Sequence, residues 1–389
     1  MNIVITFAVS MMAILLVTFT MGQDAVNAFV KISGTWLEQE KRHEAQSDTR
    51  IAGPIGASVD ESTMLRLTLT NEGDEVIGRF EDWDVIIESK RPGSPAISYL
   101  TYTENASPGA NEWTVSGIYR DAANLTPEVV DPGILNSGEE MIIVANPSPA
   151  IVAGYYDRAV FVTPNGISTK VIFKVSAVLY VADLDDGLVY MYLDDGKYKS
   201  VDFLDPDNDD ARGITTDNTD FWTVDVQDLQ TYKYPNTFNV GTPWSLDAAN
   251  ATSTGITTDG ANIWTVDPGD DAVYKYDMVG ASVSTFALDA ANTDATGITT
   301  GGGSMWVVDD QDNAVYEYSM AGVLISSFGL TAGNTEPTGV TTNGTHIWVV
   351  DHTDLKIYTY LTDGTYLNTK DITLTGPNAD PEGITVRSR

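Results

Sequence analysis

The chain has 389 residues, which is too long for one ordinary hydrophobic core and predicts two or three domains. Its 21 Lys and Arg stand against 55 Asp and Glu, so the formal net charge of −34 argues against nucleic acid and anionic membrane surfaces as partners. The absence of cysteine excludes disulfides, thiol catalysis and cysteine-ligated metals.

Residues 1–22 carry no ionisable side chain, and as a helix they would span roughly 33 Å, the thickness of a bilayer core. The apolar spacing continues past residue 22, so the sequence predicts one helix from about residue 2 to about residue 45. A plain membrane anchor is the simpler interpretation. However, the first positive charges follow the apolar run, which for an anchor would place the rest of the chain in the cytoplasm. A short basic leader, already removed, would resolve this conflict.

A charge-free N-terminal helix that continues as an amphipathic helix into a β domain resembles mature archaellins and type IV pilin-like filament subunits. The resemblance implies that the helix is membrane-inserted before assembly and then packs against its copies in the core of a filament. Ile5 stands where bacterial type IV pilins usually carry Glu, which favours the archaeal branch. The side chains expected to form this polymerisation helix are Ile5, Val9, Met12, Leu16, Phe19, Val26, Phe29, Val30 and Leu37.

The middle of the chain, residues 49–176, alternates between apolar and polar residues with a period of two. The pattern predicts six short strands, at 65–70, 83–89, 97–103, 141–145, 159–163 and 170–176, between turn signals such as "NEGD" and "TPNG". Strands without intervening helices favour an antiparallel β-sandwich. The order of these pieces is similar to the outer immunoglobulin-like domain of archaellins and archaellum accessory subunits, which implies a sleeve around the filament core.

The remainder, residues 177–389, repeats every 42 residues. Every unit contains the motif aromatic-x-Val/Ala-Asp. A Gly-Ile/Val-Thr strand and a Tyr-x-Tyr strand recur at fixed distances from it. Four strands per unit of this length predict a β-propeller, and the units resemble NHL-type repeats. The recurring aromatic residues, expected to pack between blades, are Tyr180, Trp222, Trp264, Trp306 and Trp348. A ring of aromatics presented to a sugar is the alternative role.

The two ends of the repeat array complement each other. The first unit lacks a Gly-Ile-Thr strand, and the chain finishes with one at residues 383–389. We therefore predict five blades, of which the first is closed by the C-terminal strand, since closure removes an exposed sheet edge.

Few motifs indicate chemistry at a site. Asp205, Asp207 and Asp209 begin like a calcium loop but lack its Gly and its final acid, so calcium is only a weak possibility and no other cofactor or metal is expected. The acids that end the second strands are expected to bond backbone N–H groups in turns. The sequons predict glycosylation at Asn105, Asn124, Asn250 and Asn343 if the protein is exported.

These patterns lead to three hypotheses about function. The first is a structural subunit of an extracellular, archaellum-like or pilus-like filament, a homopolymer that serves motility or adhesion and displays the propeller outside. The second is a membrane-anchored surface protein whose propeller binds a glycan or a protein. The third, an extracellular enzyme, is disfavoured because no acid–base set is seen to break the repeat symmetry, and the fold alone does not decide function.

Overall fold

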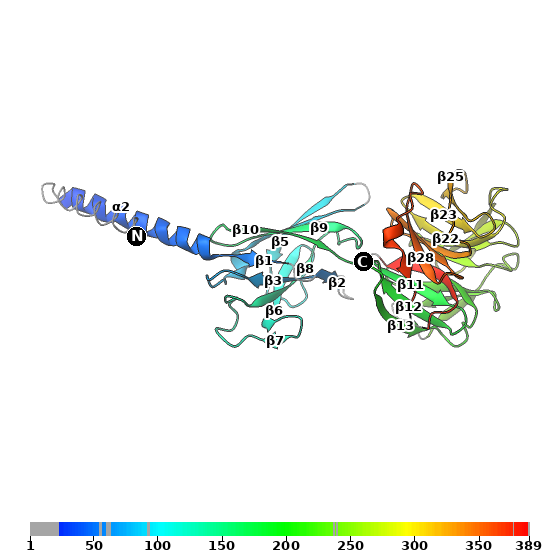
Figure 1. Ribbon diagram of the computed structural model, residues 1–389, viewed down its shortest axis with the longest axis horizontal. Helices are drawn as coiled ribbons and strands as arrows, with labels where there is room; N and C mark the ends of the chain where they lie inside the picture. The colour runs from blue at the N-terminus through cyan, green and yellow to red at the C-terminus, as the bar shows by residue number, and fades with distance from the viewer. Residues whose placement is uncertain are drawn as a thin grey trace.

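We describe the protein from a computed structural model. The structure describes residues 23–387 apart from 54–56, 60–63, 92–93, 236–237, 239 and 376. The helix α2, a β domain and a β-propeller follow one another along the long axis of the molecule (Figure 1).

Helix α2, Gln23–Asp48, is the one α-helix in the described part of the chain. Its apolar side chains Val30, Trp36 and Leu37 are exposed, and it projects from the β domain (Figure 1). Of the expected polymerisation residues, Ile5, Val9, Met12, Leu16 and Phe19 lie outside the described residues, as do the side chains of Val26 and Phe29. Among the described helices, none has the length and apolar character needed to cross a membrane.

The prediction of one long helix from residue 2 to about residue 45 is therefore wrong. Within the described residues, the structure has a helix of 26 residues, and the part of the chain that follows it is almost entirely β. The likeness of the N-terminal segment to archaellins and pilins depended on that long helix, so an archaellin or pilin is not supported. Apolar spacing indicates helical periodicity, but it does not determine how far one continuous helix extends.

The β domain is a single sheet whose path runs β1-β3-β8-β6-β5-β4-β9-β10, with β2 and β7 beside it. The bounds are β1 Ile51–Ala52, β2 Ala57–Val59, β3 Leu65–Asn71, β4 Asp84–Ser89, β5 Ala96–Tyr102, β6 Glu112–Asp121, β7 Thr126–Pro127, β8 Glu140–Asn146, β9 Tyr156–Val162 and β10 Ser168–Lys174. A 3₁₀ turn, η1, covers Phe80–Asp82. The six predicted strands lie in β3, β4, β5, β8, β9 and β10, whereas β6 was not predicted.

The two ends of this sheet almost meet, so the domain is barrel-like rather than two stacked antiparallel sheets. The Thr169 hydroxyl on β10 donates a hydrogen bond to the Ile51 carbonyl on β1, at 3.2 Å. Strands β5 and β6 pair in parallel. The prediction of an antiparallel immunoglobulin-like sandwich is corrected in these respects. Trp83 and Trp113 lie in the core.

The propeller has five four-stranded sheets in the described part of the chain, as predicted. The first blade comprises β11 Val178–Asp183, β12 Leu188–Leu193 and β13 Tyr198–Phe203 with β30 Pro381–Arg387, and the second comprises β14 Ala211–Thr216, β15 Phe221–Asp225, β16 Gln230–Tyr234 and β17 Thr242–Ser245. The third comprises β18 Gly255–Thr258, β19 Asn262–Asp267, β20 Ala272–Asp277 and β21 Ser282–Ala287, and the fourth β22 Ala295–Gly301, β23 Ser304–Asp309, β24 Ala314–Ser319 and β25 Leu324–Gly329. The fifth comprises β26 Pro337–Thr342, β27 His346–Asp351, β28 Lys356–Leu361 and β29 Ile372–Thr373. A 3₁₀ turn, η2, covers Asn368–Lys370. Strand β30 pairs antiparallel with β11, so the C-terminal strand closes the first blade.

The repeated aromatic residues Tyr180, Trp222, Trp264, Trp306 and Trp348 are all buried. Each tryptophan from Trp222 to Trp306 packs with core residues of the following blade; Trp264, for example, lies in one cluster with Ile298 and Met305. Neighbouring blades are thus joined by apolar contacts, and none of these rings faces solvent.

A continuous hydrophobic core joins the β domain to the propeller. Val175 of the segment after β10 belongs to the same buried cluster as Tyr192 and Trp348. At its edge the Lys174 ammonium pairs with the Asp194 carboxylate, Nζ to Oδ2 at 2.5 Å. A hydrogen bond between the Tyr155 and Thr345 hydroxyls adds to this contact. The junction therefore holds the propeller at a defined position on the β domain.

Candidate functional site

The propeller has two different faces. Asp194 and Thr345 lie in the turns on one face, and both contact the β domain, so this is the junction face. Strand β27 runs from His346, next to that face, to Asp351 at the opposite one. The opposite face therefore points away from the β domain, and we call it the distal face.

On the distal face, the acid that ends each second strand binds the backbone. The carboxylate of Asp309, which is fully buried, accepts the N–H of Asp312 at 2.7 Å and those of Thr293 and Asp294 at 2.8 and 3.1 Å. Asp225, Asp267 and Asp351 make equivalent bonds in their blades. These repeated acids tie two loops together, which is the turn role expected from the sequence.

The residue before the central Gly of each inner strand does break the repeat. In three blades it is Thr254, Thr296 or Thr338, whose hydroxyl donates to a carbonyl of the next blade at 3.3, 2.7 and 3.0 Å. In the two blades that meet where the ring closes, the same position holds Arg212 and Glu382.

The residue after the repeated Asp breaks the symmetry as well. It is Leu, Val or Pro in the first three blades but Asp310 and His352 in the last two. We call the group of charged residues at the centre of the distal face the distal mouth. Its members are Asp210, Arg212, Asp294, Asp310, Glu336, His352, Asp380 and Glu382.

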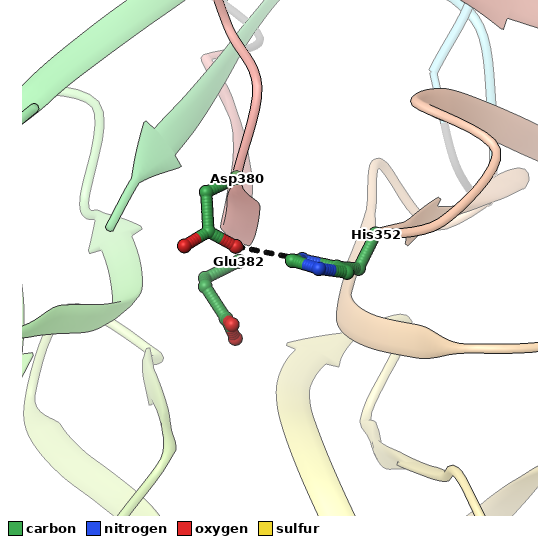
Figure 2. A group of neighbouring side chains, drawn as sticks. All are labelled: His352, Asp380 and Glu382. Atoms are coloured by element: carbon green, nitrogen blue, oxygen red, sulfur yellow. Dashed lines mark ion pairs between the residues drawn. The ribbon is translucent and has the colours of Figure 1, made fainter. Parts of the chain in front are cut away.

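His352, Asp380 and Glu382 form the tightest cluster in this mouth (Figure 2). His352 Nδ1 lies 2.8 Å from Asp380 Oδ1, and one possible ligand atom from each of the three residues lies within 4.8 Å of the others. The Asp380 and Glu382 side chains are 15% and 14% exposed, and that of His352 is 34% exposed. Because Asp380 and Glu382 are two positions apart at the start of strand β30, both can face the same side.

Burial sets the electrostatics of the mouth. Desolvation raises the pKa of Glu382 to about 7, although the Arg212 guanidinium, with Nη1 4.0 Å from Oε1, opposes the shift. Desolvation also raises the pKa of Asp310 to about 6, and the nearby charges of Asp294 and Glu336 add to the effect. Both shifts favour the protonated carboxyl groups, as expected where six acidic residues face only Arg212 and His352 within the mouth.

A ring of glycines closes the centre of the propeller beneath the mouth. A Cβ atom on Gly255 would lie 2.9 Å from the Gly297 Cα, and one on Gly383 would lie 2.8 Å from the Gly213 Cα. The throat inside this ring encloses about 10 Å³, which is room for about one water at most. Beyond it, a threonine-lined cavity of about 570 Å³ opens on the junction face. The distal mouth is thus separate from that cavity.

The other predicted site residues are scattered. Asp205, at the β13–β14 loop, accepts backbone N–H groups of Asp207 and Gly241 with its two oxygens, which is a turn role. Asp207 and Asp209 are exposed, and the structure does not gather the three carboxylates into one group within ligand distance.

The sequons divide into two pairs. Asn105 and Asn124 are exposed. Asn250 is fully buried, and its amide nitrogen, the atom that carries a glycan, donates to Thr265 and Tyr276 at 2.7 and 2.9 Å. The amide nitrogen of Asn343 is buried at the junction, 2.9 Å from where a Cβ on Gly154 would lie. The folded protein therefore offers Asn105 and Asn124 to a glycan, but not the other two.

The sequence did not predict the distal mouth, because a repeat pattern reports the residues that its units share and not those in which they differ. A signal was present: aligned units differ at the residue before the central Gly and at the residue after the repeated Asp. The substitutions to Arg, Glu, Asp and His at those two positions are the ones that converge.

No protein-family model matches the chain, and no curated protein matches it. Among solved structures, a streptogramin B lyase is 17% identical over 59% of this chain and 80% of its own, with a TM-score of 0.36. Glutaminyl cyclase of Myxococcus xanthus is 10% identical over 45% and 69%, with a TM-score of 0.35. The archaellum periplasmic stator protein of Sulfolobus acidocaldarius is 21% identical over 32% and 99%, with a TM-score of 0.23.

Two of these similar proteins are enzymes by name, but identities of 10 and 17% do not establish an enzymatic activity for this chain. The function therefore has to be argued from the site itself.

Proposed function

We propose that this chain is a surface-displayed binding protein whose propeller binds a protein or glycan partner at the distal mouth. The observation that carries the proposal is the direction of that mouth. The β domain occupies the junction face, and the propeller lies at the opposite end of the molecule from helix α2 (Figure 1). The distal mouth, on the other face of the propeller, is therefore turned away from the β domain.

Two further features support a display role. The continuous core at the junction fixes the propeller on the β domain, so the mouth is held at the far end of the molecule. The uncharged residues 1–22 are numerous enough for a membrane-attached segment, which supports attachment of the chain to a membrane. The filament hypothesis depended on the long helix, so it loses its support.

The charge of the mouth specifies the chemistry of the partner. The basic residues of the mouth are Arg212 and His352. The acidic residues are more numerous: Asp210, Asp294, Asp310, Glu336, Asp380 and Glu382. Basic side chains or amino sugars are favoured by such a site, because they bring the positive charge that the carboxylates lack. Nucleic acids and acidic glycans are disfavoured for the same reason.

Binding of oligolysine peptides and amino-sugar oligomers to the immobilised full chain tests this proposal, with neutral oligomers of equal length for comparison. We expect the basic probes to bind about tenfold or more tightly than the neutral ones, with an affinity that falls as salt rises. Asp294→Asn with Asp310→Asn should remove most of that preference.

The matched control is Asp217→Asn with Asp259→Asn, which removes two charges from the junction-face cavity. Asn keeps an acceptor for the turn N–H groups that both residues bind there. Equal losses in the two double variants would mean that net charge alone attracts the probes, and the assignment to the distal mouth would be wrong.

A further inference from the structure

We propose that His352, Asp380 and Glu382 bind a divalent transition-metal ion of the Zn²⁺ or Mn²⁺ type in the distal mouth. The inference goes beyond the binding function proposed above, because it assigns a ligand and a set of ligating residues and does not require a macromolecular partner.

The composition of the cluster selects this class of ion. One imidazole nitrogen and two carboxylate oxygens suit Zn²⁺ and Mn²⁺, whereas Ca²⁺ prefers six to eight oxygens and binds histidine poorly. Three protein ligands also leave at least one coordination position open, as in metal sites that exchange water for a ligand.

The positions of the three residues favour convergence on one point. His352 follows strand β27 of the last full blade, and Asp380 and Glu382 flank Pro381 at the start of the closing strand β30. Figure 2 shows the imidazole directed at the Asp380 carboxylate, with Glu382 beside them. The ligand atoms already lie within 4.8 Å of one another, so small side-chain rotations would bring them around one ion.

A second observation favours a cation at this cluster. Asp380 Oδ1 and His352 Nδ1 are buried, and neither has a hydrogen-bond partner of acceptable geometry. The two atoms lie 2.8 Å apart and form an ion pair when the imidazole is protonated, but no hydrogen bond joins them. Buried polar atoms without hydrogen bonds are costly, and a metal ion bound by both atoms, after a small movement apart, would remove that cost.

The residues around the cluster also supply too little positive charge to pair with its carboxylates. Arg212 is 3.1 Å from Asp210, Nε to Oδ1, but its approach to Glu382 is only 4.0 Å. This corner thus has three carboxyl groups, of Asp210, Asp380 and Glu382, beside the single guanidinium of Arg212. A divalent ion matches the remaining charge of this corner.

Calorimetric titration of the metal-stripped full chain with ZnCl₂ and MnCl₂, in the absence of any partner, tests the proposal. We expect one saturable site, a rise in Tm on metal addition, and much weaker binding of CaCl₂. His352→Gln, Asp380→Asn and Glu382→Gln should each weaken metal binding about tenfold or more, while circular dichroism shows that the variants remain folded.

Two controls separate this site from general attraction of cations. Asp259→Asn removes an exposed acid of the junction-face cavity, and His43→Gln removes an exposed histidine on α2. Both should leave the site unchanged. Absence of saturable binding, or equal weakening by Asp259→Asn, would overturn the metal site. Neither result would bear on the binding of basic probes, which is measured without metal and with different variants.

Discussion

Asp157 shows how the burial of one carboxylate couples stability to pH. It lies on β9 in the β domain and is 2% exposed. Oδ1 accepts the N–H of Lys90 at 2.7 Å, whereas Oδ2 is buried without a partner. One bond does not replace the lost hydration of the charge, so desolvation raises the pKa of Asp157 to about 6.

This residue predicts a pH-dependent difference between the wild type and Asp157→Asn. The folded state holds the Asp157 proton more tightly than the unfolded state, so its contribution to stability is lost as pH rises from about 4 to about 6. Asn has no such loss. The free energy of unfolding of the variant, relative to wild type, should therefore rise across that window, by on the order of 3 kcal/mol.

Urea unfolding of the wild type and the variant at pH 4.5 and pH 7.5 measures this difference, because the method resolves differences in unfolding free energy of about 1 kcal/mol or larger. Asp84→Asn on the adjacent strand β4 is the control, because that carboxylate is exposed to solvent. A relative stability that is equal at both pH values would show that the Asp157 charge is solvated after all.

At the scale of the element, the five inner strands of the propeller depend on glycine for close approach. The Gly of each Gly-Ile/Val-Thr strand lies where backbones of successive blades meet around the axis. The repeat therefore requires glycine here because there is no room for a Cβ, and none of these five glycines has a positive φ.

Gly297→Ala should accordingly destabilise the propeller. Its Cβ would lie 2.9 Å from the Gly339 Cα and 3.0 Å from the Val340 nitrogen, which are backbone atoms that cannot rotate away. We expect a loss of about 1–3 kcal/mol or more in the free energy of unfolding, measured from urea midpoints. Gly329→Ala on β25 meets nothing within 4 Å and should change little. If the two variants were equally stable, the tight central ring would be wrong.

At the scale of the whole molecule, strand β30 both closes the propeller ring and contributes to the core that joins the propeller to the β domain. Strand β30 completes the first blade by pairing with β11, and its Ile384 and Val386 belong to the core that continues into the β domain. The strand also supplies Glu382 to the distal mouth. The ends of the propeller sequence are thus joined at the place where the domain contact and the candidate site are formed.

Deletion of residues 383–389 from the full chain should therefore weaken the propeller and the junction together. It removes a hydrogen-bonded strand and exposes the edge of β11, which should cost several kcal/mol of a typical domain stability of about 5–15 kcal/mol. Calorimetry should show a lower Tm for the propeller, and limited proteolysis should become faster at the junction. A truncated chain that melts within a few degrees of a deletion of residues 388–389 alone would contradict the role of β30.

The sequence by itself determined the propeller. Each unit repeats its own strand pattern, and the strand missing at one end appears at the other, so blade number and closure follow from local pattern and counting. It also located six strands of the β domain, because alternation reports which residues are buried. It overstated the N-terminal helix, since apolar spacing does not limit a helix's length.

Tertiary structure alone decided the rest. Alternation specifies the buried face of a strand but not its partners, so a sandwich and a nearly closed sheet have the same pattern. They are distinguished by the parallel pairing of β5 with β6 and by the contact of Thr169 with Ile51. The distal mouth was hidden for a related reason. Arg212 and Glu382 are 170 positions apart, and they meet only because ring closure brings β30 next to β14. The pattern of a single unit does not encode that neighbourhood, because it forms only when the closed ring places the two blades side by side.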